Sequence, residues 1–167
     1  MNIFLLRHGI TVERDEWDFK SDAKRPLTPD GERQLHAIGI AMKKMGLRFD
    51  LILSSPFERA KQTAEIVAKE LDLKKRLALS DELRADGEPK KLIREIRKLK
   101  PAPENLLLVG HEPYLSGLIS VLATGKSRME IDFKKGGLCK LCVDELDYYR
   151  CAVLLWLLTP RQMELMA

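Results

Sequence analysis

The sequence lacks a long hydrophobic run, and this absence bears on where the protein works. The longest apolar stretch is Cys151–Leu158, far shorter than the roughly 20 residues that a membrane-spanning helix needs. Arg7 interrupts the apolar N-terminal run before the core of a signal peptide could form. We therefore expect a cytoplasmic protein that does not act at a membrane.

Cysteine is also scarce. The chain has Cys139, Cys142 and Cys151, and the first two form a C-x-x-C pair of the kind found in zinc sites and redox proteins. No second C-x-x-C pair and no paired histidines supply further zinc ligands. The cysteines lie in apolar segments, where a free thiol usually packs as a small hydrophobic group. We expect core cysteines, no metal and no cofactor.

Aromatic residues make up only 6% of the chain, which leaves few surfaces on which nucleic-acid bases could stack. The net charge of +4 and the isoelectric point near 9.0 nevertheless raise the question of an acidic partner. The basic run at residues 90–100 contains no aromatic residue and is typical of the solvated face of a helix. We expect no nucleic-acid partner, and the role of this run and the oligomeric state stay open.

The composition suits one globular domain. A chain of 167 residues that is 45% hydrophobic and 32% charged is long enough to bury a sizeable core. Neither disulfides nor a structural metal is needed to stabilise a domain of this size. We expect residues 1–167 to form a single domain.

Apolar patterns of strand and helix type alternate along the chain. Buried strands are predicted at residues 2–6, 50–54 and 106–109, with a short strand at 76–79. Helices are predicted from Pro29, capped by Thr28, to Gly46, and from Pro56, capped by Ser55, to Leu71. Two more helices are predicted at 88–99 and 114–125, and an antiparallel hairpin at 138–143 and 150–157.

This alternation predicts an α/β fold: a three-layer α/β/α sandwich with a mostly parallel central sheet and an antiparallel C-terminal hairpin. Ligands of such sheets gather beyond the carboxyl ends of the strands. Three predicted strands end in unusual polar residues: Arg7-His8-Gly9, residues 54–59, and Gly110-His111-Glu112. If these strands are neighbours, two histidines and two arginines converge on one site.

Those residue types point to phosphoryl chemistry. An arginine presents a fixed fork of N–H donors that matches phosphate, and an imidazole can act as a nucleophile or bind phosphoryl oxygens. Arg59 and His111 lie near the predicted starts of helices, whose N-termini attract the same anion. Glu58 and Glu112 are the only carboxylates in the three motifs, so no magnesium site is indicated.

The motifs resemble those of the histidine phosphatase superfamily, also called the phosphoglycerate mutase-like family. LRHG at residues 6–9 is similar to its signature, and DAKRPLT at 22–28 with Gly31 resembles the second block of its small phosphohistidine phosphatases, the SixA type. SPFERAKQT at 55–63 and VGHEP at 109–113 are similar to the remaining two blocks. Four blocks in the right order make a coincidence improbable.

The resemblance implies a role for each matching residue. His8 would attack phosphorus and become a transient phosphohistidine that water hydrolyses. Arg7, Arg59 and His111 would hold the phosphoryl oxygens, and Arg25 would complete the pocket. Since His8 must be neutral at the attacking nitrogen while His111 donates, we expect the two histidines to differ in protonation.

The proton donor and the substrate leave alternatives open. Residues 80–83 with Gly87 resemble the block that carries the catalytic acid, so Glu82 is the candidate, with Asp81 and Asp86 as alternatives. The leading hypothesis is a metal-independent phosphatase that acts on phosphohistidine in a protein partner, because no long insertion remains to roof the pocket. The alternatives are a phosphatase for a small phosphomonoester or sugar phosphate, and a non-catalytic phosphate- or phosphopeptide-binding module.

Overall fold

A computed structural model describes residues 1–13, 21–126 and 129–167 of the chain. Six strands form one sheet in the order β3-β2-β4-β1-β5-β6. The strands are β1 (Asn2–Arg7), β2 (Leu51–Ser54), β3 (Leu77–Leu79), β4 (Asn105–Gly110), β5 (Leu138–Val143) and β6 (Ala152–Leu158). Strands β1 to β4 are parallel to one another, and β5 pairs antiparallel with both β1 and β6. The expected mostly parallel sheet and C-terminal hairpin are confirmed.

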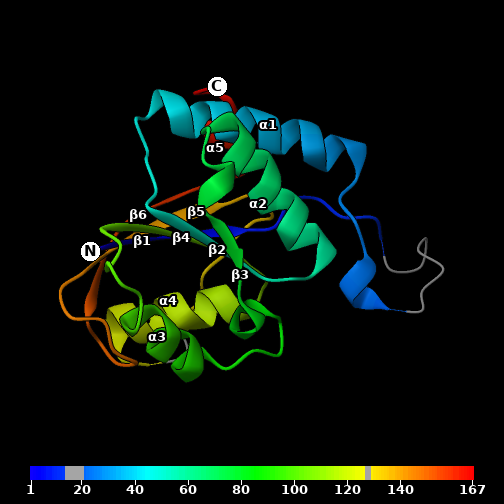
Figure 1. Ribbon diagram of the computed structural model, residues 1–167. Helices are drawn as coiled ribbons and strands as arrows, with labels where there is room; N and C mark the ends of the chain where they lie inside the picture. Colours follow the sequence, from blue (N-terminus) through cyan, green and yellow to red (C-terminus); the bar gives the residue numbers. More distant parts are fainter. Residues whose placement is uncertain (14–20, 127–128) are drawn as a thin grey trace.

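Helices cover both faces of the sheet (Figure 1). Helices α1 (Pro29–Lys44), α2 (Glu58–Glu70) and α5 (Pro160–Glu164) contribute to the hydrophobic cluster on one face. Helices α3 (Pro89–Arg97) and α4 (Tyr114–Thr124) contribute to the cluster on the other. Short 3-10 helices are η1 (Asp22–Lys24), η2 (Lys74–Arg76) and η3 (Asp81–Leu83). The three-layer α/β/α sandwich predicted from the sequence is therefore present.

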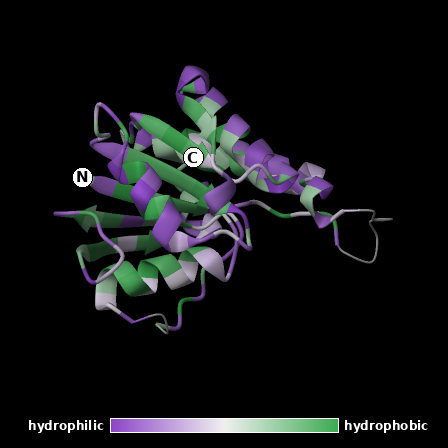
Figure 2. Ribbon diagram, turned by 60° about the horizontal axis from the view of Figure 1, so that its bottom comes forward, coloured by the Kyte–Doolittle hydropathy of each residue, from purple (hydrophilic) through white to green (hydrophobic). Residues whose placement is uncertain are grey.

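Alternating side chains of the central strands build the two clusters. In β1, Ile3 and Leu5 belong to the cluster under α3 and α4, whereas Phe4 and Leu6 belong to the one under α1 and α2. Strand β4 alternates in the same way, and Figure 2 colours the central strands mainly as hydrophobic. Both helix layers thus pack on one sheet, and packing on its two faces fixes the carboxyl ends of the central strands.

The helix boundaries follow local sequence signals, with two differences from the prediction. Thr28 caps α1 as predicted, since its Oγ1 accepts a hydrogen bond from the Gly31 amide at 3.0 Å. Helix α2 begins at Glu58 rather than at Pro56, and Ser55 does not cap it. Helix α5 was not predicted, although Thr159 and Gln162 form a capping box at its start. Among the described residues, no helix is long and apolar enough to cross a membrane.

The expectation that the cysteines lie in the core can be compared with the structure. Cys139 is fully buried in β5, and burial raises the pKa of its thiol to about 12. Cys142 and Cys151 are partly exposed, and all three are free thiols. Cys139 therefore packs as a core residue, as expected, while the other two lie at the margin of the core.

Candidate active site

The register of three neighbouring strands brings their carboxyl ends together. Arg7 of β1 pairs with Gly110 of β4, and Ser54 of β2 pairs with Val109 of β4. Beyond these pairs, the His8 amide donates to the Gly110 carbonyl at 3.1 Å, and the Ser55 amide donates to the Val109 carbonyl at 3.0 Å. The first residues after β1 and β2 are thus hydrogen-bonded to the last two residues of β4, which is the convergence that the sequence suggested.

His8 is held in one tautomer. Its Nδ1 lies 2.8 Å from the Gly9 carbonyl oxygen, and because that oxygen can only accept, Nδ1 carries the hydrogen. The side chain is 5% exposed, and burial, together with the nearby His111, Arg59 and Arg7, lowers the pKa of His8 well below its ordinary value. A neutral imidazole with Nδ1–H has its free lone pair on Nε2.

His111 faces His8 from the neighbouring strand end. The two ring centroids are 5.2 Å apart, and His111 Nε2 lies 2.8 Å from the Ser55 hydroxyl. Burial and then the charge of Arg59 lower the pKa of His111 to about 3. Both imidazoles are therefore neutral near pH 7, and the expected difference in their protonation is not found. The reason is burial, because a cationic ring would be removed from water and placed among arginines.

Arg59 and Arg25 are joined through one carboxylate. Arg59, in the first turn of α2 and 4% exposed, donates to the Asp22 carbonyl at 2.9 Å and to Asp22 Oδ2 at 3.0 Å. Arg25 donates from Nε to Asp22 Oδ1 at 3.1 Å, and from Nη1 to Thr11 Oγ1 and to the Val12 carbonyl. Asp22 therefore sets the orientation of both guanidinium groups.

Arg7 approaches the same edge from β1. Its Nη1 donates to the Phe133 carbonyl at 2.6 Å, and its buried Nε has no hydrogen-bond partner in the part of the chain that the structure describes. Burial lowers the pKa of Arg7, and the nearby carboxylates of Glu112 and Asp132 oppose this shift. A buried N–H without a partner is costly, so an incoming acceptor at this position would be bound favourably.

Helix α2 fixes the loops that carry these groups. The Gly9 amide donates to Thr63 Oγ1 at 3.1 Å, and the Leu27 amide donates to Gln62 Oε1 at 2.9 Å. A Cβ atom at Gly31 would lie 2.3 Å from the Ile10 carbonyl oxygen, so only glycine allows α1 to start this close to the loop after β1. The segments after β1 and before α1 are thus anchored to one another.

The arrangement of these residues can hold an anion with a nucleophile beside it. Three arginines supply donors, and the neutral His8 supplies a lone pair at a buried position. Within residues 1–13, 21–126 and 129–167, no group of three or more His, Cys, Asp or Glu side chains could hold a metal ion. This chemistry is what transfer of a phosphoryl group requires.

Comparison with known proteins agrees with this geometry. The family model for the histidine phosphatase superfamily (branch 1) matches residues 3–85. An uncharacterized protein from Picosynechococcus sp. is 33% identical over 142 residues, which cover 84% of each chain. The chain belongs to the histidine phosphatase superfamily. As a member of this superfamily it is a phosphatase.

Two further comparisons relate this histidine phosphatase to small enzymes of the same superfamily. The phosphohistidine phosphatase SixA of Escherichia coli is 28% identical over 128 residues, 76% of this chain and 77% of that protein. A solved structure of the protein histidine phosphatase SixA complexed with tungstate has a TM-score of 0.81 and 25% identity, covering 96% of this chain and 98% of that one. The phosphoglycerate mutase-like fold is thereby shown.

The side chain of Glu82, the expected proton donor, is hydrogen-bonded to the backbone. Its Oε2 accepts a hydrogen bond from the Glu88 amide at 3.0 Å, just before α3 begins. The 3-10 helix that carries it lies against the site, because the Leu83 carbonyl oxygen is 3.5 Å from the position of a Cβ atom at Gly110. The alternative Asp86 pairs with Arg84, and Asp81 is exposed. Glu82 therefore lies near the candidate site, but its carboxylate is hydrogen-bonded to the backbone amide at the start of α3.

Sequence reasoning missed three residues that orient this site. They are Ser55 at His111, Thr63 at Gly9, and Asp22 between the two arginines. Ser55 was interpreted as a helix cap because Glu58 follows it at the right spacing, and the structure corrects this. The i,i+3 spacing of Asp22 and Arg25 is a local signal that could have revealed their ion pair.

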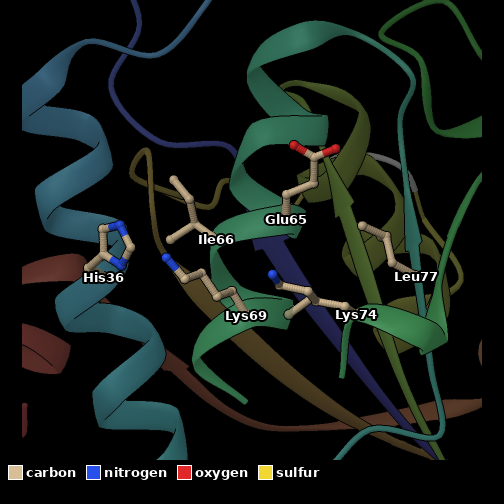
Figure 3. Close-up of a pocket in the computed structure, with 7 residues that line it drawn as sticks. His36, Glu65, Ile66, Lys69, Lys74 and Leu77 are labelled. Atoms are coloured by element: carbon tan, nitrogen blue, oxygen red, sulfur yellow. The ribbon is translucent and has the colours of Figure 1, made fainter. Parts of the chain in front are cut away.

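A cavity elsewhere in the histidine phosphatase contains none of the predicted site residues. It has a volume of about 470 Å³ and lies between α1, α2 and the start of β3, as Figure 3 shows. His36 lines it from α1, and its Nδ1 lies 2.8 Å from Glu70 Oε1 of α2. His36 is 42% exposed, consistent with the prediction that it is a structural or solvated residue.

Proposed function

We propose that this histidine phosphatase removes the phosphoryl group from phosphohistidine in proteins, without a metal, through a covalent intermediate on His8. The main support for this proposal is the hydrogen bond between His8 Nδ1 and the Gly9 carbonyl at 2.8 Å. It leaves the Nε2 lone pair available, and the lowered pKa of the buried ring keeps that lone pair free of a proton at neutral pH.

The reaction has two steps. The substrate ring reacts protonated at its other nitrogen. His8 Nε2 forms a bond to phosphorus while the P–N bond of the substrate breaks, and the substrate leaves with that electron pair as neutral imidazole. Water next attacks the phosphohistidine on His8, and inorganic phosphate leaves as Nε2 regains its lone pair. Both steps move charge on the three phosphoryl oxygens, so stabilising that charge is the main task of the site.

Arg7, Arg25, Arg59 and His111 are proposed to bind the phosphoryl oxygens. Arg7 offers its buried Nε, and Arg59 is aligned by two hydrogen bonds to Asp22. His111 is neutral, so it acts as a hydrogen-bond donor rather than as a cation. These fixed donors replace the charge that a magnesium ion supplies in other phosphoryl-transfer enzymes, which is why no metal is proposed.

Glu82 is the proposed proton donor, with Asp81 and Asp86 as alternatives. Its carboxylate would have to leave the Glu88 amide or protonate there. A phosphohistidine needs little help from an acid, because the leaving imidazole is a weaker base than an alkoxide. Glu82 therefore matters mainly for oxygen esters, and Glu82→Gln should slow ester hydrolysis more than phosphohistidine hydrolysis.

A protein substrate is proposed from the similarity to SixA, which is described as a phosphohistidine phosphatase and as a protein histidine phosphatase. Tungstate, the anion in the similar structure, has the tetrahedral shape of phosphate. We also propose that residues 1–167 form one histidine phosphatase domain that works in the cytoplasm. One sheet shared by both hydrophobic clusters and three free thiols support this.

The test measures phosphate release from a histidine-phosphorylated protein and from 4-nitrophenyl phosphate, both in excess chelator. Wild type should release phosphate from the phosphoprotein, His8→Ala should be inactive, and His36→Ala should stay within about twofold of wild type. Equal rates with wild type and His8→Ala would overturn the proposal. Turnover of the aryl ester alone would favour a small phosphomonoester, and tight phosphopeptide binding without release would favour a binding module.

A further inference from the structure

The positive charge of the chain is concentrated in one segment. The sequence has 29 Lys and Arg against 25 Asp and Glu, and residues 88–100 hold six of the former and two of the latter. The rest of the chain therefore has 23 of each sign, so the whole net charge of +4 lies in these 13 residues. The phosphoryl site does not account for this asymmetry, because none of its proposed residues lies there.

Helix α3 presents these charges on one exposed face. Leu92, Ile93 and Ile96 are buried in the cluster shared with α4, so the remaining side chains point outward. We define the α3 basic face as the six exposed cations of the segment, Lys90, Lys91, Arg94, Arg97, Lys98 and Lys100. The two acidic residues leave an excess of four positive charges: Glu95 accepts from Ser80 Oγ at 2.6 Å, and Glu88 pairs with Lys91.

Most of the α3 basic face is without ion pairs. Within the described residues, four of its six cations form none: Lys90, which lies 5.6 Å from the Tyr148 ring, and Arg94, Lys98 and Lys100. Arg97 makes a long contact of 3.7 Å with Asp147, and both side chains are about half exposed. Exposed pairs of this kind contribute little to stability, so neither folding nor the core explains why the cations are gathered here.

The N-terminal end of α3 lies beside the phosphoryl site, whereas Lys100, at the other end of the α3 basic face, lies beside the start of β2. The Phe57 ring lies 5.3 Å from the His111 ring and 5.4 Å from the Arg84 guanidinium. Arg84 therefore borders the site. Arg84 directly follows η3, whose Glu82 accepts from the Glu88 amide at the start of α3. Figure 1 shows α3 beside α4 on the same face of the sheet, and α4 starts just after His111. A protein that reached His8 and extended along α3 would contact these cations in turn, because α3 runs from the site end of the sheet toward the start of β4.

We propose that the α3 basic face docks an acidic surface on the protein that carries the phosphohistidine. This inference rests on the proposed function and adds the chemistry of the substrate surface. Opposite charges on two protein surfaces steer encounter and fix orientation. Residues 88–100 contain no aromatic residue for base stacking, and the apolar side chains of α3 are buried rather than available to a lipid surface. These facts favour an acidic protein over nucleic acid or a membrane.

The test compares two triple variants with the same loss of charge. Arg94→Gln/Lys98→Gln/Lys100→Gln removes three of the four cations of the α3 basic face that form no ion pair and leaves Lys90, which contacts Tyr148. Lys44→Gln/Lys74→Gln/Lys75→Gln removes three exposed lysines near α1 and η2 and serves as the control. The substrates are an acidic protein phosphorylated on histidine with phosphoramidate, and free phosphohistidine as the small substrate without a protein surface.

At low salt, the α3 variant should lose about tenfold in kcat/KM on the acidic phosphoprotein, mainly through KM, and the loss should disappear in high salt. Its turnover of free phosphohistidine should match wild type, and the control variant should match wild type on both. Equal behaviour of the two variants on the phosphoprotein would overturn the docking surface. If wild type hydrolyses neither substrate, the proposed function itself fails, which is a different result.

Two binding measurements complete the test. Wild type is mixed with single-stranded and duplex DNA, and with vesicles of anionic phospholipid. No binding beyond that of the control variant is expected. Binding to either probe that is tighter than binding to the phosphoprotein, and that is lost in the α3 variant, would assign the surface to that probe and overturn the proposal.

Discussion

His111 links the free energy of unfolding to pH. Burial and Arg59 lower its pKa from 6.5 to about 3, so the unfolded chain binds the proton more readily than the folded protein. The stabilisation from the neutral ring is fully present above pH 6.5 and is lost as the pH falls toward 3. Between pH 7 and pH 5 this one group should cost about 2 kcal/mol, because each pH unit below the unfolded pKa costs about 1.4 kcal/mol.

The assay is urea unfolding followed by circular dichroism at pH 7, 6 and 5. His111→Gln removes the titrating ring, so the variant should lose about 2 kcal/mol less than wild type over this range. Its lower starting stability does not matter, because the comparison concerns the change with pH. His36→Gln, which removes a partly exposed imidazole that lines the cavity between α1 and α2, is the matched histidine control.

One result would refute the reasoning. If wild type and His111→Gln lose the same free energy of unfolding between pH 7 and pH 5, to within about 0.5 kcal/mol, His111 is not kept neutral by folding. The ring would then be protonated or hydrated in the folded protein. His8 remains in both proteins, so its own titration cancels in the comparison.

Three further predictions concern the reacting group, its supports and the core. The pKa of His8 is lowered by burial first and by neighbouring charges second, so kcat should persist below pH 6.5, and a halving of kcat at pH 6.5 would contradict this. Asp22→Asn should lower kcat/KM for 4-nitrophenyl phosphate about tenfold by releasing Arg25 and Arg59, whereas Asp30→Asn at an exposed ion pair should not. Leu118→Ala, at a site 1% exposed, should cost about 2–5 kcal/mol in urea unfolding, and a cost similar to that of the exposed Leu165→Ala would contradict the packing.

The sequence predicts the fold well where local signals and packing agree. Thr28 and Pro29 mark the start of α1, and the alternating apolar residues of β1 and β4 mark strands that are buried on both faces. Strand ends with Arg7, His8 and His111 also identify the edge at which the site lies, because parallel strands bring their carboxyl ends to one side of a sheet.

The rest depends on contacts between distant residues. Ser55 has a hydroxyl that suits a helix cap, and only the fold brings His111, 56 positions away, within 2.8 Å of it. The protonation of His111 depends on how deeply the ring is buried, which no local pattern contains. The pairing of Asp22 with Arg59 likewise joins residues 37 positions apart.

The carboxylate of Asp22 has a consequence for the end of the reaction. Its two oxygens already offset part of the positive charge of Arg25 and Arg59 before any phosphoryl group arrives. Inorganic phosphate has the same oxygens as the group that is transferred, so a pocket of uncompensated arginines would hold the product as firmly as the transition state. If Arg25 and Arg59 bind the phosphoryl group as proposed, their pairing with Asp22 weakens the binding of the product and so favours turnover over inhibition by phosphate.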